Sequence, residues 1–181
     1  YAAGMHDAAM ELIHHNLQAV RRSGAKQLLV TCPSCYHMWQ EQVPRLTGEH
    51  LDFEVIHAVD WLDHALTAGA LQLKPLQARV TYHDPCDLGR VSGIYETPRK
   101  LLQAIPDLDL HEMQHNHALS LCCGGGGDVE MNDEALFANV ARRRILEAQE
   151  TDAEYLVSAC QQCKRTLATA ARGEKLPIRV L

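Results

Sequence analysis

The sequence lacks an excess of basic residues and any long apolar run. Its 181 residues carry 17 Lys and Arg against 23 Asp and Glu, a net charge of -6. A protein that binds nucleic acid needs clustered basic charge to neutralise phosphates, so we expect no nucleic-acid partner. No apolar stretch approaches the roughly 20 residues of a membrane-spanning helix, and we find no signal-peptide pattern. We therefore expect no transmembrane segment in this chain.

Cysteine, in contrast, is abundant, with seven residues. They form two Cys-x-x-Cys pairs, one adjacent pair and one single residue, namely Cys32 and Cys35, Cys160 and Cys163, Cys122 and Cys123, and Cys86. A secreted disulfide scaffold is usually smaller, and its cysteines pair evenly. An odd number with two Cys-x-x-Cys pairs indicates metal or redox chemistry in a reducing compartment. We therefore expect a cytoplasmic protein.

Hydrophobic periodicity predicts helices alternating with short apolar strands. The predicted helices cover residues 5–22, 59–66, 97–105 and 132–150, and the predicted strands cover residues 27–31, 53–56, 79–82, 108–112, 118–121 and 155–158. This alternation predicts an α/β fold with a mostly parallel sheet and flanking helices. Ligands of such sheets collect at the carboxyl ends of the strands. Since each cysteine group follows a predicted strand, we expect the cysteine loops to converge on one sheet edge.

A faint internal repeat predicts two parts. Aligning Cys32 with Cys160 superposes Ala25 on Ala153, and residues 28–29 on 156–157, each behind an amphipathic helix. The chain also opens directly into a helical pattern without an initiator methionine, so we expect a trimmed chain. We predict that residues 1–75 are the C-terminal part of a first module and that residues 76–181 form a complete second module.

The spacing of the later cysteines favours a multi-iron cluster. Soft thiolates suit iron–sulfur clusters, zinc or copper(I). Five convergent thiolates exceed the four ligands of a structural zinc ion, but suit a cluster whose irons share them. Residues 124–127 are all glycine, which lets the backbone approach an inorganic core. A zinc-binding structural domain remains the alternative. A thioredoxin-like dithiol protein is disfavoured, because it would leave Cys122 and Cys123 without a role.

Three segments resemble a known family. Residues 83–86 (His-Asp-Pro-Cys), 122–124 (Cys-Cys-Gly) and 160–163 (Cys-Gln-Gln-Cys) are similar to the CCG cysteine-rich domain of heterodisulfide reductase catalytic subunits and related iron–sulfur oxidoreductases. The resemblance covers residues 79–181. Residues 31–35 resemble the end of a preceding domain of the same kind. The earlier Cys and Cys-Cys-Gly of that domain are absent, so Cys32 and Cys35 are only a candidate second site.

The resemblance implies a non-cubane [4Fe-4S] cluster, at which a disulfide substrate is cleaved in two one-electron steps. The implied ligands are Cys86, Cys122, Cys123, Cys160 and Cys163. It further implies an oxidoreductase subunit whose partners are other subunits of a redox complex. The implied substrate is a disulfide, a thiol or another small molecule. A quinone pool lies downstream in this interpretation, with membrane association only through a partner.

Four histidines near the cysteines allow two interpretations each. His83 either lines the cluster pocket or bonds local backbone at a strand end, and the second is favoured. His111, His115 and His117 form either a metal-binding tract or a solvated turn, and the turn is favoured.

Three charged residues complete the set of candidates. Arg144 lies within the apolar face of a predicted helix, where it either balances an anionic cluster or extends its charged end to solvent. The second is the default expectation. Asp87 and Arg90 follow Cys86 closely, and we expect them near a substrate.

Overall fold

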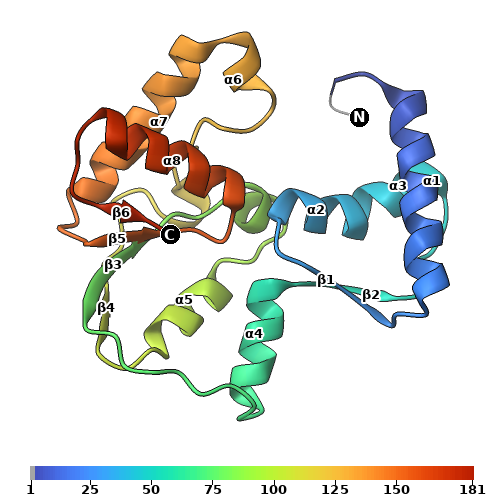
Figure 1. The fold of residues 1–181 in the computed structure, drawn as a ribbon, viewed down its shortest axis with the longest axis horizontal. Helices are drawn as coiled ribbons and strands as arrows, with labels where there is room; N and C mark the ends of the chain where they lie inside the picture. Colours follow the sequence, from blue (N-terminus) through green and yellow to red (C-terminus); the bar gives the residue numbers. More distant parts are fainter. Residues whose placement is uncertain (1–2) are drawn as a thin grey trace.

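Parallel strands form two separate sheets in the computed structural model, which describes residues 3–181 (Figure 1). The smaller sheet pairs β1 (Gln27–Val30) with β2 (Glu54–His57). The larger sheet has the order β4 (Leu108–Leu110), β3 (Ala78–Tyr82), β5 (Tyr155–Val157) and β6 (Arg179–Val180). Every strand pair among residues 3–181 is parallel. The predicted α/β fold with parallel strands and flanking helices is confirmed.

The smaller sheet packs against helices from the first part of the chain. These are α1 (His6–Ser23), α2 (Pro33–His37), the π-helical turn η1 (Met38–Gln42), α3 (Val43–Thr47) and α4 (Ala58–Thr67). Helix α1 ends where Gly24 adopts φ 68°, a left-handed conformation that glycine takes without strain. Ile13 and Leu17 of α1 are buried against Val43 and the strand residue Val55. This cluster is one of two hydrophobic cores in the described part of the chain.

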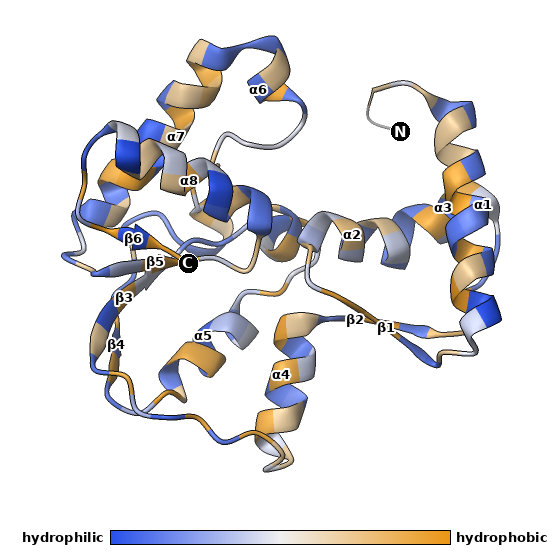
Figure 2. Ribbon diagram, in the orientation of Figure 1, coloured by the Kyte–Doolittle hydropathy of each residue, from blue (hydrophilic) through white to orange (hydrophobic). Residues whose placement is uncertain are grey.

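The larger sheet carries helices on both sides. Helices α7 (Glu134–Gln149) and α8 (Gln161–Gly173) lie on one side, and α5 (Glu96–Gln103) lies on the other (Figure 1). Hydropathy alternates along α7 and α8, as expected for helices with one buried face (Figure 2). Ile145 of α7, Leu156 of β5 and Leu167 of α8 are each fully buried in the core between these elements. The division of the chain at residue 75 stays a prediction.

The strand predicted over residues 118–121 is wrong. The segment contains the 3-10 turn η3 (His117–Leu119), followed by irregular chain. The carbonyl oxygens of Ala118 and Ser120 accept hydrogen bonds from the Arg90 guanidinium instead of from a neighbouring strand. Conversely, the two-residue strand β6 was not predicted, because so short a pairing leaves no periodicity in the sequence. No helix among residues 3–181 is both long and apolar enough to span a bilayer.

Candidate metal centre

Two neighbouring strands bring two cysteine loops together. The pairing of β3 with β5 continues past the strand ends, because the His83 N–H donates to the Val157 carbonyl over 2.9 Å. The loop that carries Cys86 and the loop that carries Cys160 therefore leave the sheet side by side. This is the carboxyl edge of a parallel sheet, where ligand sites of α/β proteins form.

The second Cys-x-x-Cys pair begins helix α8. Cys160 is the N-cap residue, with extended backbone, and Cys163 lies in the first turn. The first N–H groups of a helix have no acceptor within the helix and form the positive end of its dipole, so they stabilise a thiolate. Hydrogen bonding with the Cys163 side chain and, despite burial, with the N–H groups of Cys163 and Gln162 lowers the pKa of Cys160 to about 7.

Cys122 and Cys123 come from the irregular loop before α6 (Val129–Asn132), not from a strand. The Gly124 N–H lies 3.3 Å from the Cys122 sulfur, and the Gly125 N–H lies 3.4 Å from the Cys123 sulfur. Hydrogen bonds from the Cys122 and Cys163 thiols hold the pKa of Cys123 far below its usual range, although burial opposes the shift. Donation to that thiolate raises the pKa of both Cys122 and Cys163.

Close packing requires glycine after the adjacent cysteines. A Cβ at Gly125 would collide with the Thr166 hydroxyl of α8 and lie 2.8 Å from the Gln162 side chain. Gly124 adopts φ 88°, and a Cβ there would lie 3.0 Å from the Phe137 carbonyl oxygen. The Cys-Cys-Gly-Gly sequence therefore lets the loop lie against α7 and α8 with its N–H groups directed at sulfur.

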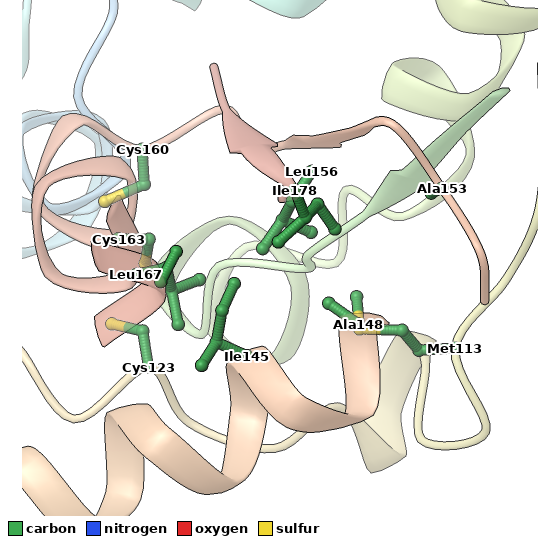
Figure 3. Close-up of a cluster of buried hydrophobic side chains, with 11 residues drawn as sticks. Met113, Cys123, Ile145, Ala148, Ala153, Leu156, Cys160, Cys163, Leu167 and Ile178 are labelled. Carbon is green, nitrogen blue, oxygen red and sulfur yellow. The ribbon is translucent and has the colours of Figure 1, made fainter. Parts of the chain in front are cut away.

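Cys123, Cys160 and Cys163 form a buried cysteine trio at one end of the second core (Figure 3). A ring nitrogen of His83 and the sulfurs of Cys123 and Cys163 lie within 4.8 Å of one another. Cys122 is exposed beside the trio, and Cys86 is half-buried. Burial raises the pKa of Cys86, and the nearby charges of Asp87 and Cys123 act in the same direction.

Cys32 and Cys35 form a separate pair at the start of α2. Burial is the main cause that raises the pKa of Cys35 to about 11, and a hydrogen bond with Cys32 is the second cause. Two contacts join this segment to the larger sheet: the Ser34 hydroxyl donates to the Asp87 carboxylate, and the Gln161 amide donates to the Thr31 carbonyl over 3.1 Å. The pair thus lies beside the Cys86 and Cys160 loops, and its role as a second site stays a prediction.

A buried ion pair fixes the loop between β3 and Cys86. Arg99 of α5 donates to both carboxylate oxygens of Asp84, at 2.7 and 2.9 Å, and to Glu112 at 2.6 Å. The side chains of Arg99 and Asp84 are 5% and 3% exposed. Burial would raise the pKa of Asp84, but the hydrogen bonds and charge of Arg99 lower it. Sequence analysis missed Arg99. The sequence did contain one indication: the Asp84 carboxylate follows a buried strand, and a buried carboxylate needs a cation as its partner.

The structure corrects the favoured interpretations of two residues near the cysteines, Arg144 and His83. The expectation that Arg144 extends to solvent is wrong, because its side chain is completely buried. His83 does more than bond local backbone, since its Nδ1 accepts a hydrogen bond from Arg144 Nε over 3.0 Å. Desolvation lowers the pKa of His83, although its hydrogen bond with Cys123 opposes the shift. The hydrogen bond to Glu147, three residues on in the same helix, offsets part of the desolvation of Arg144. Its other partners, His83, His115 and Ser120, come from distant segments that no local pattern indicates.

The remaining candidates have structural partners. The three histidines after β4 contact different carboxylates, which agrees with the predicted turn and not with a shared metal site. The pairs are His111 with Asp109, His115 with Glu147, and His117, the first residue of η3, with Glu96. Arg90 anchors the carbonyl of Ser120 over 2.6 Å. Asp87 accepts from Ser34 and lies 3.7 Å from the Cys86 sulfur. Contact of Asp87 or Arg90 with a substrate stays a prediction.

The donor set fits a soft-metal group. Three sulfurs are buried together, two more cysteines lie beside them, and glycine N–H groups are directed at sulfur. Thiolates with backbone donors are the environment in which iron–sulfur clusters and zinc are held. The cysteines are free thiols in this structure, so no disulfide competes for them.

Comparison with known proteins identifies the family. The sequence model of the CCG cysteine-rich domain matches residues 1–40 and 80–168. The chain belongs to the CCG cysteine-rich domain family. It is 38% identical over 177 residues to one subunit of the dihydromethanophenazine:CoB–CoM heterodisulfide reductase of Methanosarcina acetivorans, covering 97% of this chain and 43% of that protein. The chain thus spans less than half the length of this curated relative.

Two further proteins that are similar to this chain have names of redox or iron–sulfur proteins. An EtfAB:quinone oxidoreductase of Syntrophomonas wolfei is 30% identical over 170 residues, which cover 90% of this chain and 23% of that protein. An uncharacterised iron–sulfur protein of Methanococcus maripaludis is 29% identical over 161 residues, which cover 89% of this chain and 30% of that protein. The CCG domain therefore occurs here in a sequence similar to parts of longer redox proteins.

Proposed function

We propose that this chain is an iron–sulfur redox subunit of a heterodisulfide reductase-like oxidoreductase. Its cofactor is a non-cubane [4Fe-4S] cluster with the ligands Cys86, Cys122, Cys123, Cys160 and Cys163. The single observation that carries the proposal is the buried cysteine trio, with its neighbouring cysteines and glycine N–H groups. The names of the relatives, which include a heterodisulfide reductase subunit and an iron–sulfur protein, support it.

The residues of the chain have distinct tasks in this proposal. The start of α8 holds two sulfurs where helix N–H groups favour thiolates. Gly124 and Gly125 direct N–H groups at sulfur, and Ile145 and Leu167 exclude water from beneath the site. When bound, the cluster supplies single electrons and an iron that accepts a substrate sulfur.

The proposed substrate is a disulfide, a thiol or another small molecule that exchanges electrons at this edge. The Methanosarcina relative is named for a heterodisulfide, and the Syntrophomonas relative is named for a quinone. We extend both to this chain as proposals: electrons pass to or from a small substrate, with a quinone-linked partner. The other partners are subunits of a redox complex, and the complex is cytoplasmic or attached to a membrane through a partner.

The second candidate is a zinc-binding structural domain that docks partners. It is favoured by the compact group of His83, Cys123 and Cys163, whose ligand atoms lie within 4.8 Å of one another. Three close ligands with a fourth from Cys160 would satisfy the tetrahedral preference of zinc. The two candidates differ in sulfide, which only an iron–sulfur cluster contains.

Metal and acid-labile sulfide analysis of anaerobically purified protein tests the proposal, together with an EPR spectrum. We expect about four iron and four sulfide per chain. Cys123→Ser should lower iron content and thermal midpoint together, because binding to the folded state alone adds to stability. Cys32→Ser is the matched control and should change iron content little. One zinc without sulfide would replace the proposal with the structural candidate, and equal losses in both variants would place Cys32 in the same site.

A further inference from the structure

The side chain of Arg144, on α7, is completely buried. Its guanidinium donates hydrogen bonds to Glu147 on the same helix and to residues of other segments. Its Nη1 donates to Glu147 over 2.8 Å and to the His115 carbonyl over 2.9 Å. Its Nη2 donates to the Ser120 hydroxyl over 3.0 Å, and its Nε donates to His83 Nδ1 over 3.0 Å. Glu147 balances the charge of the guanidinium at Nη1. The Nε–H is a separate donor, and it orients the imidazole ring of His83.

This contact decides where the proton of His83 lies. A guanidinium has five N–H donors and no acceptor, so the Nδ1 that faces Arg144 must present its lone pair. A neutral imidazole with an unprotonated Nδ1 carries its proton on Nε2. The Nε2–H is then the donor of a ring that is 1% exposed, and a ring nitrogen of His83 lies within 4.8 Å of the sulfurs of Cys123 and Cys163.

The same contact argues against His83 as a metal ligand. A histidine that binds metal through Nε2 normally carries its proton on Nδ1 and donates it to an acceptor. Here the Nδ1 position faces the Nε–H of Arg144, which leaves no acceptor for such a proton. The approach of His83 to Cys123 and Cys163, within 4.8 Å, therefore places a donor beside sulfur and not a third ligand.

We propose that Arg144 holds His83 as the Nε2–H tautomer, which donates to the sulfur of Cys123 and raises the reduction potential of the group that this cysteine binds. The inference rests on the proposed function for its redox consequence. A hydrogen bond to a thiolate ligand stabilises the more negative, reduced state, and such bonds are one of the means by which a protein sets cluster potentials. His83 and Arg144 are positioning residues for this site.

Redox titration followed by EPR tests the consequence in the cluster-loaded full chain. His83→Leu removes the donor but fills the space, so its reduction potential should fall at unchanged iron and sulfide content. His83→Gln offers both an acceptor to Arg144 and an N–H to sulfur, so its potential should lie closer to that of the unmodified protein. His111→Gln, at an exposed histidine directly after β4, is the control and should leave the potential unchanged. An unchanged potential in His83→Leu would overturn the inference.

A second measurement uses the protein without any substitution. Pulsed EPR of the cluster-loaded protein, labelled with nitrogen-15 histidine, should find only the weak coupling of a nitrogen hydrogen-bonded to a ligand sulfur. The strong coupling of a nitrogen bound to iron would refute the inference while leaving the proposed cluster intact.

If metal analysis instead gives zinc without sulfide, the proposed function fails separately. Nitrogen-15 NMR of the zinc-loaded full chain then decides the tautomer, with His83→Gln identifying the signals. A protonated Nε2 supports the assignment of His83, and a metal-bound Nε2 with a protonated Nδ1 refutes it.

Discussion

Replacing Arg99 with methionine should strongly destabilise the protein, because it leaves Asp84 charged and without its partner. Arg99 contributes both of its terminal nitrogens to Asp84, and the two side chains are 5% and 3% exposed. Removal of one member of a buried ion pair typically costs about 3–5 kcal/mol, since the remaining charge stays desolvated. The His117 N–H still donates to Asp84 over 2.9 Å, so we expect the lower part of that range, about 3 kcal/mol.

The pH dependence supplies a second signature of the same pair. Arg99 lowers the pKa of Asp84 in the folded state, so the stabilisation is fully present above the unfolded pKa of about 3.9 and is lost as pH falls through the lower folded value. In Arg99→Met, burial without the arginine raises the pKa of Asp84 instead, so the difference in free energy of unfolding from the unmodified chain should shrink as pH falls towards and below about 4.

Urea unfolding, followed by circular dichroism at matched metal content, measures both effects. Arg21→Met is the control, because Arg21 pairs with Glu49 and Asp52 at the surface and such pairs contribute little. A deficit in Arg99→Met no larger than in Arg21→Met, or one that stays constant as pH falls, would refute the argument that Asp84 is a desolvated charge.

Two further pairs of substitutions test how the site and its core are packed. Gly125→Ala should lower metal content and thermal midpoint, because its Cβ would collide with Thr166, whereas Gly126→Ala has open space around its Cβ and should behave like the unmodified protein in the same melts. Leu156→Ala should cost about 2–5 kcal/mol in urea unfolding, since Leu156 is fully buried, and Leu119→Ala, at a residue 75% exposed, should be nearly silent. Similar behaviour within either pair would contradict the packing described for it.

Several features of the fold were accessible from the sequence because they depend on neighbouring residues. The short apolar runs at residues 27–31 and 79–82 gave strands, and the 3.6-residue period at residues 5–22 gave a helix. The failure at residues 118–121 has a specific cause. That segment has the apolar character of a strand, but Arg90, far from it in sequence, takes its carbonyl oxygens as acceptors.

The sequence by itself indicated the α/β class, the parallel strands and a supply of soft ligands, because backbone periodicity and residue chemistry are local properties. Only the tertiary structure separated the strands into two sheets and grouped Cys123, Cys160 and Cys163 as the buried trio. It also decided the partners of the buried charges, such as Arg144 with His83, 61 residues apart. A charge removed from water must find its hydrogen bonds wherever the fold supplies them, and no pattern along the chain specifies that choice.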